Sequence, residues 1–194
     1  MRAFLATVAL MLCADAAMAH NVVAGVGGFP GGLLHPLLVP MHVIAIVGLG
    51  LLAGQQVAGM RRWLLAMFTA GLLVGVISIV LAFASEAAEL VLLLCAAVAG
   101  LLTAIARPAP LLLAGPLVAV AGAALELDSV PEEISMQATV LALLGTVIAA
   151  LLVFAVVAAI GAGRTHQWQR IGIRVLGSWI AASAILILAL RLAR

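Results

Sequence analysis

Long apolar runs, separated by short polar or charged clusters, dominate the pattern of the chain. Each run is close to the ~20 residues that a helix needs to cross a bilayer, although the first and the fourth are short. Membrane-spanning strands would alternate apolar and polar positions between turns, and the sequence has no such pattern. The pattern therefore predicts an all-α integral membrane protein, a six-helix transmembrane bundle. The six runs are residues 40–54, 63–83, 87–106, 110–124, 137–162 and 171–190.

The beginning of the chain has the pattern of a secretory signal peptide. Arg2 gives a positive start, residues 4–13 are apolar but too short to span, and residues 17–19 (Ala-Met-Ala) match a small-x-small cleavage site. Cleavage would make His20 the mature N-terminus, and the alternative is an uncleaved first anchor. We therefore expect a signal peptide at 1–19 and a six-span membrane domain at 20–194.

A stretch rich in glycine and proline leads into the first apolar run. Residues 21–32 are expected to form a loop or a re-entrant segment rather than a span. A proline disfavours the α conformation in the residue before it, so Pro36 and Pro40 should hold His35 and Val39 out of a helix. The first good helix is therefore expected to start near Pro40.

Small residues recur within the apolar runs. Gly71 and Gly75 form a GxxxG step, which lets two helix backbones approach closely. We interpret this step as helix packing rather than as part of a substrate path.

Composition excludes several classes of protein. Of the 194 residues, 67% are hydrophobic and 8% are charged, whereas a soluble domain usually carries about 25% charged residues. The net charge of +2 is small and all nine basic residues are Arg, so neither nucleic-acid binding nor lysine-dependent chemistry is expected. The sequence has no HExxH, GxSxG or Walker motif. We therefore expect no enzyme and no organic cofactor.

The charges divide between the two sides of the predicted bundle. With residue 20 on the outer side, six arginines face the cytoplasm and six carboxylates face outward, as the positive-inside rule requires. Glu126, Asp128 and the two acids that follow are expected in one acidic outer loop, whereas Arg191 and Arg194 fall outside against the rule. The arginines are Arg61, Arg62, Arg107, Arg164, Arg170 and Arg174, and the carboxylates are Glu86, Glu89, Glu126, Asp128, Glu132 and Glu133.

Two histidines, His35 and His42, lie where the glycine-rich stretch meets the first run. Ionisable side chains are costly inside a bilayer, so such a cluster is a candidate site. On one straight helix the two would be about 10 Å apart along the axis, but an extended segment at 35–39 could bring both rings together. The alternative is that they cap a helix or bond a backbone carbonyl. Met41 beside them could be a soft ligand for Cu(I) or could simply pack against apolar neighbours.

The same stretch resembles the HupE/UreJ family of small bacterial inner-membrane proteins, which are linked to nickel or cobalt supply. The family motif HPLxGxDHxxAM is matched by His35, Pro36, Leu37 and His42, and the run VGLGLLAGQQ that follows is also similar. The motif Gly and Asp are Val39 and Met41 here. A second family patch, HGxAHGxE, corresponds to AVAGAALE at 119–126, which has no His and retains only Glu126 as the acid.

The resemblance implies a permease or metal-handling protein of the inner membrane, with its mature N-terminus in the periplasm. Ni(II) and Co(II) favour imidazole and carboxylate ligands. The candidate ligands are His35, His42, His20, Met41 and Glu126. The expected partners are the lipid bilayer and a transition metal ion. One alternative is an accessory subunit that packs on other membrane subunits or on itself without transporting, and a second is Cu(I) handling through Met41.

Overall fold

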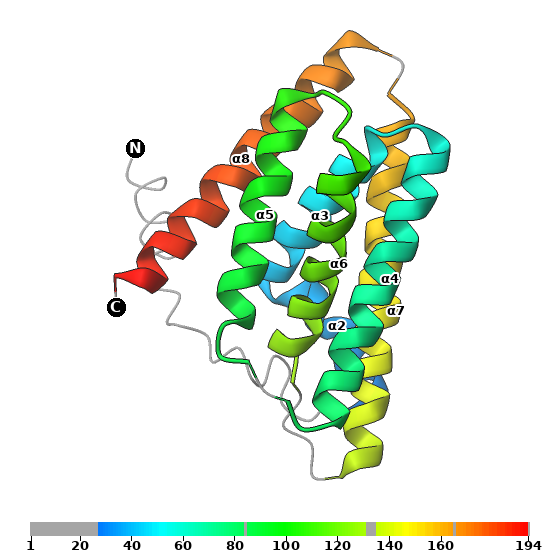
Figure 1. The fold of residues 1–194 in the computed structure, drawn as a ribbon, viewed down its shortest axis with the longest axis vertical. Helices are drawn as coiled ribbons and strands as arrows, with labels where there is room; N and C mark the ends of the chain where they lie inside the picture. Colours follow the sequence, from blue (N-terminus) through cyan, green and yellow to red (C-terminus); the bar gives the residue numbers. More distant parts are fainter. Residues whose placement is uncertain (1–26, 84, 131–134, 165, 194) are drawn as a thin grey trace, which may run out of the picture.

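The computed structural model describes residues 27–83, 85–130, 135–164 and 166–193, and these form seven helices and no strand (Figure 1). The expected signal peptide and His20 lie outside the described residues. The helices are α2 (Gly28–Leu38), α3 (Pro40–Gly54), α4 (Ala58–Val80), α5 (Ala88–Ile105), α6 (Leu111–Asp128), α7 (Met136–Ala162) and α8 (Gln167–Leu192).

Five of these helices, α4 to α8, are long and apolar enough to cross a membrane. The sixth candidate span is the pair α2 and α3, which meet at an angle of 73°. The prediction of an all-helical membrane bundle is therefore confirmed. The count of six spans holds if the bent pair is one span.

The structure corrects the prediction for the glycine-rich stretch. Helix α2 begins at Gly28 and includes both His35 and Pro36, so His35 is helical and only Val39 is extended, with φ −87° and ψ 111°. The reason is tertiary: Gly32 lies directly against the carbonyl of Ala142 in α7, and the hydroxyl of Thr146 donates to the Gly32 oxygen at 3.1 Å. Packing along α7 thus outweighs the local effect of the proline.

The structure also corrects the position of the fourth span. Helix α6 extends past the predicted end at residue 124 to Asp128, so Glu126 and Asp128 are helical rather than part of an acidic loop. Ala, Leu and Glu are strong helix formers, and the stretch Ala123 to Leu127 consists of these residues alone.

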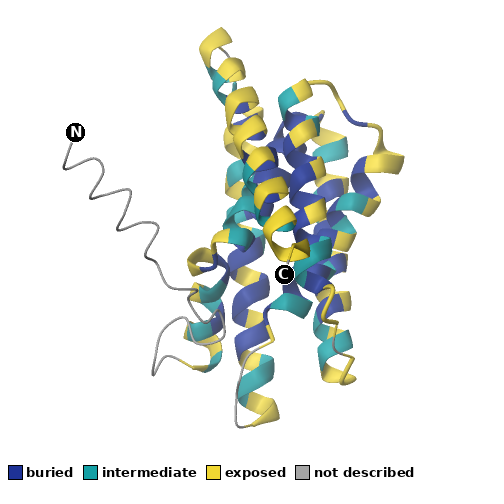
Figure 2. Ribbon diagram, turned by 90° about the vertical axis from the view of Figure 1, so that its left-hand side faces the viewer, coloured by how far each residue is buried: buried dark blue, intermediate teal, exposed yellow. Residues whose placement is uncertain are grey.

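Helix α3 is the centre of the bundle. It contacts every other helix that the structure describes, and most of its residues from Ala45 to Gly54 are buried. In Figure 1, α4 and α7 lie on one side of it and α5 and α8 on the other, while α6 crosses in front. In Figure 2 the buried residues face this interior and the exposed ones cover the outside, where lipid would lie.

Glycines set the distance between the most closely packed helices. A Cβ added at Gly71 would overlap the carbonyl of Ala119, and one at Gly75 would lie 2.5 Å from the Cβ of Glu126. The GxxxG step of α4 therefore packs directly on α6, as predicted. Gly100 of α5 and Gly177 of α8 form an equivalent close contact.

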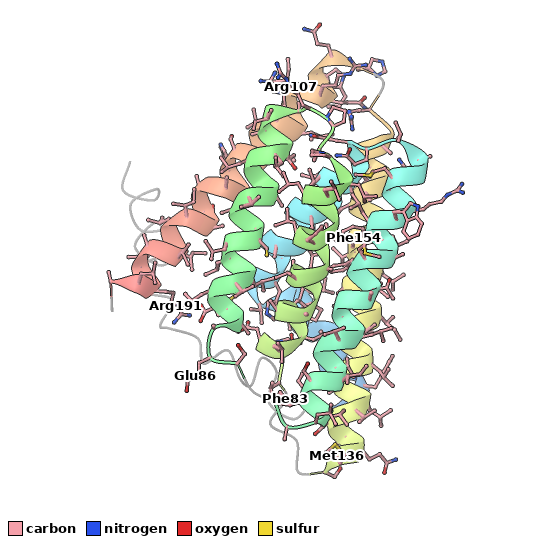
Figure 3. The ribbon with its side chains drawn as sticks, in the orientation of Figure 1. Phe83, Glu86, Arg107, Met136, Phe154 and Arg191 are labelled. Carbon is pink, nitrogen blue, oxygen red and sulfur yellow. The ribbon has the colours of Figure 1, made fainter. Side chains whose placement is uncertain are left out.

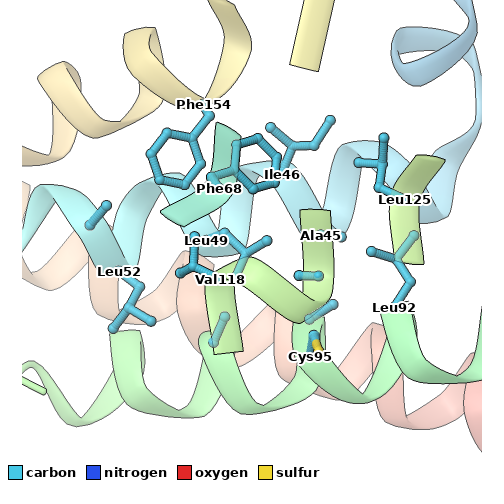
Figure 4. Close-up of a cluster of buried hydrophobic side chains, with 14 of the residues drawn as sticks. Ala45, Ile46, Leu49, Leu52, Phe68, Leu92, Cys95, Val118, Leu125 and Phe154 are labelled. Atoms are coloured by element: carbon cyan, nitrogen blue, oxygen red, sulfur yellow. The ribbon is translucent and has the colours of Figure 1, made fainter. Parts of the chain in front are cut away.

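The core is filled by aliphatic side chains and one aromatic pair. Phe68 of α4 stacks on Phe154 of α7 with ring centroids 4.7 Å apart, beside Ile46 and above Leu49 of α3 (Figure 4). Free Cys95 is buried in the same cluster, as a small apolar residue would be.

The described charged residues lie at opposite ends of the bundle. We call the end with Arg61, Arg107, Arg164 and Arg170 the arginine end, and the end with His42, Glu86 and Asp128 the histidine end. Figure 3 shows Arg107 at the top of the molecule and Glu86, with Arg191, near the bottom. The predicted separation of Arg from carboxylate therefore holds for the described residues, with Arg191 as the exception.

Candidate functional site

The break between α2 and α3 brings the two histidines together. Pro40 has no N–H and Val39 is extended, so the helix stops at Leu38 and restarts at Pro40 in a new direction. The ring centroids of His35 and His42 are consequently 5.1 Å apart, edge to face. The two rings do come together, as the sequence analysis allowed, but a bend at one residue achieves it rather than an extended segment.

His42 is fully buried and bonded to a carboxylate. Its Nε2 lies 2.8 Å from Oδ2 of Asp128, the last residue of α6. A carboxylate can only accept a hydrogen bond, so Nε2 carries the proton. In a neutral imidazole the other nitrogen, Nδ1, then presents a lone pair, and that atom is buried with no hydrogen-bond partner among the described residues.

This arrangement is the one that metal-binding histidines usually have. A ligating imidazole generally donates its other N–H to a carboxylate, which fixes the tautomer and makes the free nitrogen a better ligand. Asp128 orients His42 in this way. The bond joins α3 to α6 across 86 residues of sequence.

Glu126 is the second buried group at this end. The residue is fully buried, and neither carboxyl oxygen has a hydrogen-bond partner within the part of the chain that the structure describes. Its Cβ faces Gly75, where a larger residue would not fit. An ionised carboxylate buried without donors costs several kcal/mol, so Glu126 requires either a proton or a cation.

The other predicted ligands are placed less favourably. Met41 is half-buried and packs against the main hydrophobic cluster, and His20 lies outside the described residues. Across the described ranges no three His, Cys, Asp or Glu side chains are grouped so that they could hold a metal ion together. The arrangement thus offers one oriented imidazole nitrogen with a second ring beside it, and a separate buried carboxyl group two residues before Asp128 on α6.

Asp128 was not among the predicted ligands. The sequence analysis placed it in an acidic loop, and nothing in its local sequence distinguishes it from the other acids. A longer helix prediction for residues 111–128 would have put it on the last turn of α6, but its pairing with His42 depends on how α6 packs on α3.

Two other polar groups interact with residues close to them and not with the histidine pair. Arg191 of α8 pairs with Glu89 of α5 at 2.7 Å, which accounts for a basic residue at the histidine end. His166 lies at the opposite end, where it forms a capping box with Gln169 at the start of α8. Neither group belongs to the candidate site.

Comparison with known proteins gives one result. The family model described as HupE / UreJ protein matches residues 8–187, nearly the whole chain. No curated protein and no solved structure matches the chain.

Proposed function

Because the chain belongs to the HupE/UreJ family of membrane proteins linked to nickel and cobalt supply, we propose that it moves or hands over a divalent transition metal ion of that type through the site at His42. The observation that supports this most directly is the buried Nδ1 of His42, held ready by the Asp128 carboxylate. No enzymatic step is part of the proposal.

In this proposal the metal ion binds first to His42. His35 and Glu126 then act as further ligands, one after the other. The groups come from the bent pair α2 and α3 and from α6, so small movements of these helices change the distances between them. A carrier site must release its ion as well as bind it, and a loosely assembled ligand set suits release better than a closed cage. His20, if it is the mature N-terminus, is a further candidate ligand in this proposal.

Copper handling is the weaker version of the proposal. Cu(I) prefers thioether sulfur, but Met41 packs as an apolar residue against the core, and the buried carboxyl of Glu126 is a harder ligand that suits Ni(II) or Co(II). Binding of Ni(II) and of Cu(I) to the purified protein, compared in His42→Ala and Met41→Ala variants, distinguishes the two metals.

The test is nickel uptake by cells that express the protein at matched membrane levels. We expect His42→Ala to abolish uptake and Asp128→Asn to weaken metal affinity about tenfold or more, as loss of an orienting carboxylate does elsewhere. His166→Ala is the matched control, because it removes an imidazole at the opposite end of the bundle.

Unchanged uptake in His42→Ala, with the protein intact in the membrane, would contradict the transport proposal. If the same variant also co-purified normally with other membrane subunits, the role of a non-transporting accessory subunit would replace it.

A further inference from the structure

A cavity of about 350 Å³ opens at the arginine end, at the other end of the bundle from His35 and His42. It lies where α3, α5 and α7 end and α4 and α8 begin. Three arginines and two glutamines give it a polar lining. The lining residues are Gly54, Gln55, Gln56, Arg61, Ala106, Ala162, Arg164, Arg170 and Ile173.

The positive charge of this cavity has no acidic counterpart among the described residues. Arg61 is half-buried, and its guanidinium has no acceptor in the described ranges; the same holds for the exposed Arg170. The described carboxylates lie at the histidine end. Converging like charges with no carboxylate attract an anion, because the protein around them screens them less than water does.

Arg164 forms hydrogen bonds that hold helix ends together, and its positive charge also adds to that of the cavity. It donates to the carbonyls of Gly54, Gln55 and Gly161, which are the orphan acceptors at the ends of α3 and α7. Burial, and then the nearby charge of Arg170, lowers the pKa of Arg164. An anion in the cavity would offset the repulsion between these two guanidinium groups.

Neutral donors complete the lining. Gln55 and Gln56 are buried, and each amide nitrogen donates one N–H, to Thr103 O and Leu52 O respectively. The second N–H of each amide has no partner in the described part of the chain. Guanidinium and amide N–H groups are the donors that hold a phosphate oxyanion.

An apolar groove of about 420 Å³ adjoins the cavity between α4 and α7. Arg61 and Ala162 line both spaces. The rest of the groove is almost entirely apolar. Its lining residues are Arg61, Arg62, Leu65, Phe154, Ala155, Ala158, Ala159, Ala162 and Gly163.

We propose that the arginine end binds an acidic phospholipid, with the phosphate in the cavity on Arg61, Arg170 and the two glutamine amides, and an acyl chain in the groove between α4 and α7. A cationic cavity that continues into an apolar groove is complementary to an amphiphile with an anionic head. A free phosphate compound would use the cavity but would gain nothing from the groove. This site is independent of the metal site.

Native mass spectrometry of the full-length protein in detergent tests the proposal, with added phosphatidylglycerol, phosphatidylcholine or inorganic phosphate. We expect Arg61→Gln and Arg170→Gln each to weaken phosphatidylglycerol retention about tenfold to a hundredfold, the effect of losing one charge-assisted hydrogen bond. Arg107→Gln is the matched control, because it removes one charge from the same end without lining the cavity. Arg61→Lys keeps the charge and should recover part of the binding.

A second pair of variants separates lipid from free phosphate. Ala159→Phe fills the groove and should weaken phosphatidylglycerol retention, whereas Val156→Phe, exposed elsewhere on α7, should not. Phosphate that displaces the lipid fully, with no effect of Ala159→Phe, would overturn the lipid assignment in favour of a free phosphate compound. Equal loss in Arg61→Gln and Arg107→Gln, or equal retention of phosphatidylcholine, would overturn the site altogether.

Discussion

Glu126 places a carboxyl group inside the bundle where neither oxygen meets a hydrogen-bond donor among the described residues. Such a group lowers stability, because burial removes its hydration and nothing replaces it. A buried acid of this kind in a membrane span usually serves a function, such as contact with a cation or a proton. Substitution of Glu126 should therefore affect stability and transport in opposite directions.

We expect Glu126→Leu to stabilise the protein by about 1–3 kcal/mol. Leucine is similar in size to glutamate, and the change removes a buried polar group that has no hydrogen-bond partner among the described residues. We expect the same change to lower nickel uptake. Thermal unfolding in detergent and uptake in cells measure the two effects, and Glu86→Leu, at an exposed position of the same end, is the control. A less stable Glu126→Leu protein would mean that the carboxyl group has a favourable partner in the folded state.

At the scale of the helices, some features predicted from the local sequence agree with the structure and others do not. Their apolar stretches were readable because a span must be long and apolar wherever it lies in the bundle. The end of α6 and the start of α2 were predicted wrongly, since charged or glycine-rich sequence normally marks a loop. In this fold α6 keeps its acids within the helix, and α7 supplies a close-packed surface on which the glycines of α2 can be helical.

Helix α4 allows a matched test of close packing. Gly71→Ala puts a methyl group into the Ala119 carbonyl of α6, so we expect a loss of stability of about 1–3 kcal/mol, as for other overpacked sites. Gly59→Ala on the same helix has nothing within 4 Å of the new Cβ and should be neutral or stabilising, because Ala is the better helix former. Thermal unfolding of both variants in detergent checks the pair, and equal unfolding temperatures would contradict the close contact of α4 with α6.

At the scale of the whole molecule, the described charges form two poles. The arginine end has a polar cavity and the histidine end has the His42–Asp128 pair, with the aliphatic core between them. Arg191 is the exception, and its ion pair with Glu89 ties the far end of α8 to the start of α5. A surface ion pair of this kind contributes little to the free energy of unfolding, typically up to about 1 kcal/mol, but it gives the charge of Arg191 a partner at the histidine end.

The separation of charge predicts that the arginine end faces the cytoplasm. Cysteines introduced by Gly59→Cys and Ser85→Cys, one near each end, test this after Cys13 and Cys95 are replaced by Ala. In intact cells a membrane-impermeant maleimide should label the Ser85→Cys variant and should reach the Gly59→Cys variant only after the membrane is opened. The reverse pattern would invert the orientation and place the candidate metal site on the cytoplasmic side.

By itself, the sequence determined that this is a helical membrane protein of the HupE/UreJ family, since apolar length and the motif around His35 and His42 are properties of continuous segments. Only the tertiary structure decided that His42 is buried against Asp128, that Glu126 is enclosed beside Gly75, and that Arg61 and Arg170 meet at one cavity. These contacts join residues far apart in the chain. They depend on how closely the small residues let the helices approach, and no local pattern encodes that distance.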